Sequence, residues 1–147
     1  MNYDKLIAQL KIDEGVRRSR YKDSVGIWTI GVGHNIEADP SYPYRLADEP
    51  LTDWQIDVLL QKDIAVVVQE LDSNCNWWRA MDDLRQRVLA NMCFNLGWSR
   101  LSKFAATLQA MHFSDYSAAA QGMRASLWAK QVGARAERLA VQMEKGP

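Results

Sequence analysis

The chain has 147 residues, of which 48% are hydrophobic and 24% are charged, with 8 Gly, 4 Pro and 2 Cys. This composition is typical of one folded globular domain and excludes collagen-like and disordered chains. The 18 basic and 18 acidic residues cancel, so the chain lacks the basic excess that marks most nucleic-acid-binding proteins.

The charges are unevenly distributed along the chain. Residues 24–74 hold two basic residues against nine acidic ones, which gives this segment a net charge of −7 and leaves +7 for the rest. A basic surface outside the acidic segment is therefore available to an anionic polymer.

The cysteines and the N-terminal sequence indicate the cellular compartment in which the chain is expected. Cys75 and Cys93 form no CxxC pattern, and a chain of this size needs no disulfide, so we predict two free core side chains. The start of the chain has no basic stretch followed by an apolar one, and no window approaches 18 apolar residues. The sequence thus predicts a soluble chain made in the cytoplasm, without signal peptide or membrane anchor.

The first part of the chain predicts a helix followed by a small sheet. Apolar residues at positions 6, 7 and 10 share one helical face, so a helix is expected over about residues 2–14, with Gly15 as its stop. Glu14 then stands at the helix end. Residues 21–26 have the composition of a turn, and residues 27–32 are rich in β-forming side chains, which favours a hairpin or small sheet.

The middle of the chain predicts a loop and two long helices. Residues 35–51 contain three of the four prolines and indicate an irregular surface loop. Thr52 and Gln55 have capping-box spacing and open a helix that is expected to end at about Leu71. Residues 81–96 are apolar on more than one side and predict a central buried helix that ends at a glycine.

The C-terminal part predicts further helices and completes an α+β fold. Three shorter helices are expected, the second capped by Ser114, over about residues 101–111, 115–127 and 134–145. We predict a single domain over residues 1–147. It has a small β-containing lobe at about 16–51, joined by a long helix to a mostly helical lobe at about 72–147 together with the N-terminal helix. Such an architecture has a cleft between its lobes.

Metal and nucleotide sites are not predicted. The chain has two histidines, no HExxH pattern and no Cys/His cluster at ligand spacing. Gly31 and Gly33 begin a dinucleotide-loop pattern, but Ile36 stands where the third glycine belongs, and no P-loop is present. We expect no cofactor.

One pair of carboxylates remains as a candidate for chemistry. Glu14 ends the first helix and Asp23 lies in the following turn, with Thr29 and His34 on the next strand. Two acids on opposite walls of a cleft can hydrolyse an acetal, one donating a proton and the other handling a water. On spacing alone, solvated surface acids and a helix-end charge are the better explanation of the pair, because 18 acidic residues offer many such pairs.

Longer motifs identify a family. The runs IDEGVR at residues 12–17, YKDSVG at 21–26 and WTIGVGH at 28–34 resemble the phage endolysins of the T-even phage lysozyme type, glycoside hydrolase family 24. The similarity continues over nearly the whole chain, in Asn91–Gly97, Phe104, Trp128 and Gly133–Arg138.

The resemblance implies a lysozyme-like fold and a muramidase that cuts the β-1,4 bond between N-acetylmuramic acid and N-acetylglucosamine in peptidoglycan. Glu14 matches the proton donor, Asp23 the second carboxylate, and Thr29 the hydroxyl that helps to place water. The donor must hold its proton until the bond breaks, whereas Asp23 must stay ionised. The family expectation is inversion, which needs carboxyl groups about 6.5 to 9.5 Å apart.

Further positions carry over as binding residues. Phe94, Asn95 and Thr107 match residues that line the sugar cleft, where Asn95 could bind an N-acetyl group and Phe94 could pack on a sugar ring. For Phe94, a place in the core of a buried helix is an equal alternative.

Three positions carry over as supporting residues. Arg135 matches an arginine that approaches the catalytic glutamate, with a plain surface ion pair as the alternative. His34 and Asp63 match an ion pair that joins the sheet to the following helix, and a carboxylate beside an imidazole raises the histidine pKa.

The chain departs from the T-even type between His34 and Thr52, where a short proline-rich segment replaces a longer hairpin and loop. The upper wall of the cleft and the number of sugar subsites are therefore not carried over. The expected setting is host lysis by a monomer that acts on the wall once a holin opens the inner membrane. A wall-binding module without catalysis, a lytic transglycosylase and a module of a larger lytic protein are the alternatives.

Overall fold

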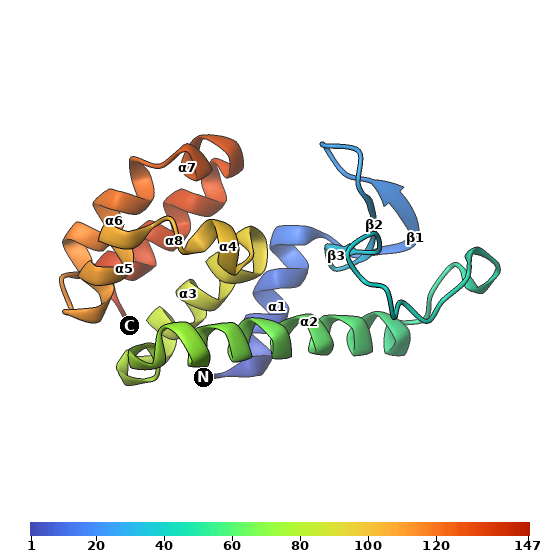
Figure 1. Cartoon of the computed structure of the whole chain (residues 1–147), viewed down its shortest axis with the longest axis horizontal. Coiled ribbons are helices and arrows are strands. Elements are labelled where there is room, and N and C mark those ends of the chain that lie inside the picture. Colours follow the sequence, from blue (N-terminus) through green and yellow to red (C-terminus); the bar gives the residue numbers. More distant parts are fainter. The chain divides into compact units, whose positions relative to one another are not determined.

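The computed structural model describes all 147 residues and contains eight α-helices, two short 3-10 helices and one small sheet (Figure 1). The α+β class predicted from the sequence is confirmed. None of the helices has the length and apolar character needed to cross a membrane.

Contacts divide the chain into two compact units. We call residues Tyr3–Ala65 the sheet unit, and Met1–Asn2 together with Val66–Pro147 the helical unit. The division falls within one long helix. The N-terminal helix groups with the sheet, whereas the sequence analysis assigned it to the helical lobe. Lys11 of this helix forms an ion pair of 3.0 Å with Asp57 of the same unit.

The sheet unit is built around three antiparallel strands in the order β1-β2-β3. Its elements are α1 (Tyr3–Glu14), β1 (Arg17–Lys22), β2 (Trp28–Gly31), β3 (His34–Asn35), the 3-10 helix η1 (Leu46–Asp48) and the first part of α2 (Asp53–Asn74). Tyr21 of β1 lies opposite Thr29 of β2, and Ile30 of β2 lies opposite His34 of β3. The pairing between β1 and β2 contains an irregularity between Arg17 and Tyr21.

The core of the sheet unit forms where α1, the sheet and α2 bury their apolar faces. Its buried apolar side chains are Leu6, Leu10, Ile30, Val32, Leu51, Ile56, Leu59, Leu60 and Ile64. They come from a helical spacing in α1 and α2 and from the strand region between them, so the unit buries one continuous set of side chains.

The segment between β3 and α2 is irregular apart from η1, as its prolines predict. It is fastened to β1, because the Arg20 guanidinium pairs with Glu49 at 2.6 Å and the Leu51 amide donates to the Arg18 carbonyl at 2.8 Å. The predicted capping box is present: the Thr52 amide donates to Gln55 at 2.8 Å, and the Gln55 amide donates to the Thr52 hydroxyl at 3.2 Å.

The helical unit packs its helices around α3. Its elements after α2 are the 3-10 helix η2 (Asn76–Ala80), α3 (Asp83–Leu96), α4 (Trp98–Leu101), α5 (Ala105–His112), α6 (Tyr116–Arg124), α7 (Leu127–Val132) and α8 (Ala134–Lys145). Most residues of α3 from Gln86 to Cys93 are buried, and the helix ends at Gly97 with a positive φ of 72°. The predicted central helix is therefore confirmed.

Several helix boundaries differ from the prediction: α2 runs to Asn74 and not to about Leu71, and α5 begins at Ala105 and not at about residue 101. Asp115 caps α6, because its carboxylate accepts from the Ala118 amide at 3.1 Å, whereas Ser114, the predicted cap, has a left-handed φ of 60°. The helix expected over 115–127 ends at Arg124, and Ser126 caps a separate helix, α7. Several residues at this point can cap a helix, so the pattern alone did not fix which one does.

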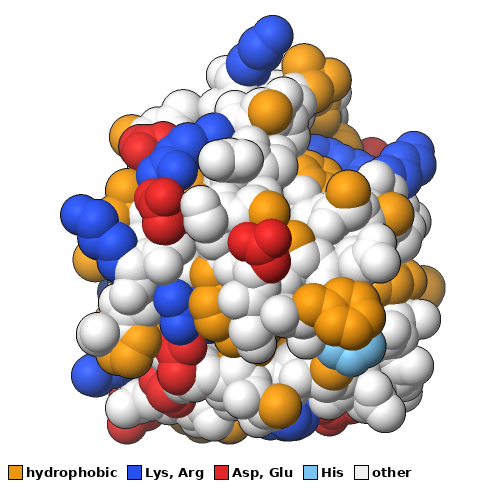
Figure 2. Space-filling view, turned by 90° about the vertical axis from the view of Figure 1, so that its left-hand side faces the viewer, with side chains coloured by type: hydrophobic (Ala, Val, Ile, Leu, Met, Phe, Trp, Pro, Cys, Tyr) orange, Lys and Arg blue, Asp and Glu red, His pale blue; other side chains and the backbone are white.

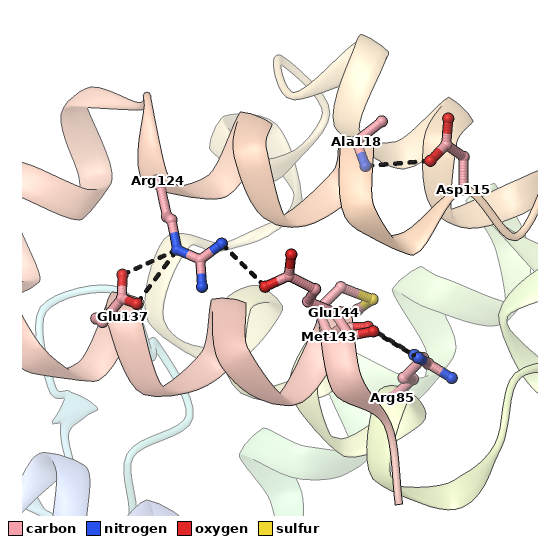
Figure 3. Close-up of polar contacts among 7 residues, drawn as sticks. All are labelled: Arg85, Asp115, Ala118, Arg124, Glu137, Met143 and Glu144. Carbon is pink, nitrogen blue, oxygen red and sulfur yellow. Dashed lines mark hydrogen bonds and ion pairs between the residues drawn. The ribbon is translucent and has the colours of Figure 1, made fainter.

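Ion pairs and hydrogen bonds tie α3, α6 and α8 together (Figure 3). Arg124 of α6 lies between Glu137 at 3.0 Å and Glu144 at 3.3 Å, both on α8. Arg85 of α3 donates to the carbonyl oxygens of Met143 at 2.7 Å and Glu144 at 3.1 Å, near the end of α8. A cation there satisfies carbonyl groups that the helix leaves unpaired.

Both cysteines are free and buried, as predicted. Burial, with the negative charge of Glu70 nearby, raises the pKa of Cys93 to about 12. Burial also raises the pKa of Cys75. Because the thiolate is the reactive form, neither thiol is activated for nucleophilic chemistry.

Candidate active site

Glu14 is the last residue of α1 and packs against Gly33. Gly15 follows it with a φ of 74°, so the chain turns away from the helix at once. A Cβ atom on Gly33 would lie 2.8 Å from Oε2 of Glu14 and 3.1 Å from its carboxyl carbon. Gly33 also has a φ of 65°. Only glycine therefore leaves the Glu14 carboxyl where it stands.

Asp23 uses one of its two carboxyl oxygens in hydrogen bonds within its own turn. Oδ1 accepts hydrogen bonds from the amides of Val25 and Ile27, each at 2.9 Å. The Asp23 amide in turn donates to the Ile27 carbonyl at 2.9 Å, which closes the turn between β1 and β2. These contacts fix the orientation of the half-buried carboxyl group and leave Oδ2 for a water or a substrate.

Thr29 offers an acceptor. Its side chain is buried, with 5% exposed, and its hydroxyl donates to the Ile27 carbonyl at 2.9 Å. Since the hydroxyl hydrogen is engaged there, the oxygen can accept a hydrogen bond from a water molecule. This is the property that a water-placing residue needs.

Tyr21 is a site residue that the sequence analysis did not single out. It is half-buried, and burial raises its pKa, with further increases from the negative charges of Glu14 and Asp23 and a partly offsetting effect of Arg17. The charges of both candidate acids therefore act on this phenol. The available signal was strand pairing, because Tyr21 stands directly opposite Thr29.

His34 is held between two carboxylates. Its Nδ1 lies 2.8 Å from Asp63 and its Nε2 lies 2.9 Å from Asp39. Burial lowers the histidine pKa, but the hydrogen bonds and charges of Asp63 and Asp39 outweigh burial, so the pKa is raised. The ion pair with Asp63 was predicted, whereas Asp39, in the irregular segment, was missed.

The helical unit holds the predicted binding residues in packing contacts. Asn95 accepts a hydrogen bond from the buried Trp128 indole at 2.7 Å. Thr107 has 6% of its surface exposed, and its hydroxyl lies where a Cβ on Gly122 would come within 2.2 Å. Phe94 is half-buried. Asn95 and Thr107 thus have clear structural roles within this unit.

A residue of α3 holds the Arg135 side chain of α8 in place. Its Nε donates to the Asn91 side chain at 3.0 Å, and Asn91 is buried. The contact fixes the base of the guanidinium group within the helical unit. The role in orienting Glu14 that the resemblance implies stays a prediction.

The chain has no group of three or more His, Cys, Asp or Glu side chains placed to hold a metal ion.

Comparison with known protein families shows to which family the chain belongs. A family model described as phage lysozyme matches residues 11–143. The chain belongs to the phage lysozyme family. The resemblance to phage endolysins drawn from the sequence motifs is thereby confirmed, and the chain is a lysozyme-type cell-wall hydrolase, a glycoside hydrolase with peptidoglycan as its substrate.

Individual relatives cover most of the chain. "Probable T4-type lysozyme 1" of Dictyostelium discoideum is 27% identical over 93% of this chain and 92% of its own length. "Endolysin" of Salmonella phage P22 is 30% identical over 84% of this chain and 80% of its own length. "Pre-baseplate central spike protein Gp5" of Enterobacteria phage T4 is 30% identical over 88% of this chain but only 26% of its own length.

Proposed function

We propose that this phage lysozyme is an N-acetylmuramidase that hydrolyses the β-1,4 bond between N-acetylmuramic acid and N-acetylglucosamine. The observation that carries the proposal is that Glu14, Asp23 and Thr29 belong to one compact unit, in which the charges of both acids act on Tyr21. Glu14 packs against Gly33 at the end of α1, whereas Asp23 accepts two amide hydrogen bonds in the turn between β1 and β2.

In the proposed reaction, Glu14 donates a proton to the glycosidic oxygen as the bond to the anomeric carbon breaks. Positive charge then develops on the sugar ring, and Asp23 stabilises it with the oxygen that the protein leaves open. The same carboxylate takes a proton from the attacking water, which the Thr29 oxygen helps to hold. Attack from the face opposite the leaving group inverts the anomeric carbon.

We further propose that Phe94 and Asn95 contact the glycan, with the Asn95 amide nitrogen as a donor to an N-acetyl carbonyl. Its oxygen is already engaged by Trp128, so the amide has a fixed orientation. Thr107, whose hydroxyl lies against Gly122, is proposed to line the same sugar-binding surface.

The proposed biological role is host lysis by a monomer that reaches the wall after a holin opens the inner membrane. A relative of similar length is named "Endolysin", which supports this setting. Bacteria that produce the chain should stay intact until their inner membrane is permeabilised, and should then lyse. Lysis without permeabilisation would contradict the proposed dependence on a holin.

Product analysis tests the proposed activity. Purified peptidoglycan is treated with the wild type or with Glu14→Gln, and the released fragments are identified by mass spectrometry. We expect fragments with reducing-end N-acetylmuramic acid from the wild type alone. Anhydro ends would instead show transglycosylation, and binding without release would show a wall-binding module. Proton NMR of the first-formed anomer tests inversion.

A further inference from the structure

Strand β1 carries four basic side chains, and two of them form ion pairs with carboxylates of the sheet unit. Arg18 pairs with Asp53 at the start of α2. Arg20 pairs with the buried carboxylate of Glu49 at 2.6 Å. These two arginines therefore fasten the sheet to the segment that precedes α2 and to α2 itself.

Arg17 differs from both, because no carboxylate of the chain pairs with it. Its guanidinium lies over the Tyr21 ring, 4.4 Å from the ring centre. Across the strands it faces Gly31, which has no side chain to offer. A cation over an aromatic face is held in place while its hydrogen-bond donors stay exposed to solvent.

The ring that holds Arg17 belongs to the candidate active site. Tyr21 stands opposite Thr29, and the charges of Glu14, Asp23 and Arg17 all act on its phenol. Arg17 is thus a cation held on the Tyr21 ring, on the face of the sheet that carries Thr29. Lys22 also lies over an aromatic ring, that of Trp28, at 5.1 Å. Its side chain is on the opposite face of the sheet, because successive side chains of a strand alternate between the two faces.

We propose that Arg17 is a specificity-determining residue that binds a carboxylate of the peptide attached to the glycan strand. The inference rests on the proposed muramidase function and names the part of the substrate that this side of the site reads. The sugars of a peptide-bearing strand are uncharged, whereas the acidic residues and C-termini of the peptides carry carboxylates. A guanidinium presents paired donors that match a carboxylate.

The test compares two forms of one substrate. Soluble, uncrosslinked peptidoglycan strands are used as prepared, or after carbodiimide and methylamine convert their carboxylates to methylamides. Removing an exposed charge-assisted hydrogen bond is expected to lower kcat/KM about tenfold. The wild type should lose this factor on the amidated strands. Arg17→Gln should lose it on the native strands and lose nothing further on the amidated ones.

Two variants control the comparison. Lys22→Gln removes a cation from the same strand and a similar aromatic contact, and it should keep the wild-type response to amidation. Arg17→Lys keeps the charge but loses the paired donors, so it should retain part of the preference for native strands. All measurements are made at one ionic strength, because exposed charges are screened by salt, and thermal unfolding checks that each variant is folded.

The outcomes separate this inference from the proposed function. The inference is overturned if Arg17→Gln keeps the full wild-type response to amidation, or if it loses the same factor on both substrates, which would mean a role in catalysis only. If the wild type releases no reducing ends, the muramidase proposal fails. Co-sedimentation in a Glu14→Gln background then still measures whether Arg17 prefers native over amidated walls, and equal binding would overturn the inference.

Discussion

The sheet unit and the helical unit use polar side chains for different ends. In the sheet unit, Asp23 and Thr29 are held by backbone groups of the turn between β1 and β2, and each keeps one oxygen available. In the helical unit, Asn95 and Thr107 are engaged by neighbouring helices. In the sheet unit, backbone groups of one turn therefore orient the candidate catalytic side chains, whereas in the helical unit contacts between helices hold the candidate binding side chains.

The largest expected effect is the loss of the proton donor. Glu14→Gln should lower kcat/KM about a thousandfold, because a positioned general acid contributes roughly 10²- to 10⁴-fold. Asp4→Asn, at the other end of the same helix, removes an exposed carboxylate and should leave activity unchanged. Equal activity of the two variants in a turbidity assay with purified walls would contradict the proposed role of Glu14 as the proton donor.

A smaller effect is expected when the Glu14 carboxyl is displaced. Gly33→Ala places a methyl group 2.8 Å from Oε2 of Glu14, so kcat should fall about ten- to a hundredfold, as expected for a misplaced catalytic group. Gly97→Ala introduces similar strain at a φ of 72°, with no atom within 4 Å of the new Cβ. Both variants should lose about 1 kcal/mol of stability, but only Gly33→Ala should lose activity. Equal losses of activity would contradict the packing argument.

Near neutral pH, the pH dependence of stability should come from His34 of the sheet unit. The pKa of His34 is raised in the folded state, so its stabilising contribution is complete below the unfolded pKa, about 6.5, and is lost as pH rises through the folded pKa. The pKa of Asp39 is lowered, despite burial, by hydrogen bonds from Ser41 and His34. Its contribution is present above the unfolded pKa, about 3.9, and is lost as pH falls through the folded pKa.

Urea unfolding of His34→Asn between pH 5 and 9 tests this expectation. The variant should lose the decline in stability above pH 6.5, which amounts to about 1.4 kcal/mol for each unit by which the folded pKa exceeds the unfolded one. His112→Asn, which changes the exposed histidine of the helical unit, should keep the decline. A wild-type pH profile in His34→Asn would contradict the account.

The smallest expected effect concerns a helix cap in the helical unit. Asp115→Ala removes the acceptor for the Ala118 amide and should lower stability by about 1 kcal/mol without changing kcat/KM. Ser114→Gly should be neutral or stabilising, because glycine tolerates the φ of 60°. Thermal unfolding of both variants checks this expectation. A larger loss of stability in Ser114→Gly than in Asp115→Ala would indicate that Ser114 is the cap.

Local signals in the sequence predicted several elements well. The end of α1 at Glu14, the capping box at Thr52 and the end of α3 before Gly97 each depend on residues within one helical turn. The glycines at these helix ends adopt the left-handed backbone that predicts a stop. Such features can be predicted because their cause lies within a few residues.

Features that depend on tertiary contacts could not be predicted in this way. Asp39 reaches His34 only because the irregular segment folds back, and Tyr21 joins the site only through pairing with Thr29. The short helices α4 and α7 were missed because few residues carry their periodicity. The sequence analysis singled out Glu14, Asp23 and Thr29 because a family motif joins them, since spacing alone did not distinguish the two carboxylates from the other acidic residues.

The helical unit also presents a surface on which side chains of every class mix (Figure 2). Trp77 stacks on His112 at 5.1 Å, and His112 stacks on Phe113 at 4.8 Å. Because Phe113 is 70% exposed, this stack lies at the surface of the unit.

The most direct test of the central claim is cleavage of purified peptidoglycan in H₂¹⁸O, followed by mass spectrometry of the released fragments. The account predicts that the wild type and Asp4→Asn release fragments with one ¹⁸O at the reducing end of N-acetylmuramic acid, and that Glu14→Gln releases essentially none. Labelled fragments released by Glu14→Gln at the wild-type rate, or label placed on N-acetylglucosamine, would contradict the assignment of Glu14 as the acid of a muramidase.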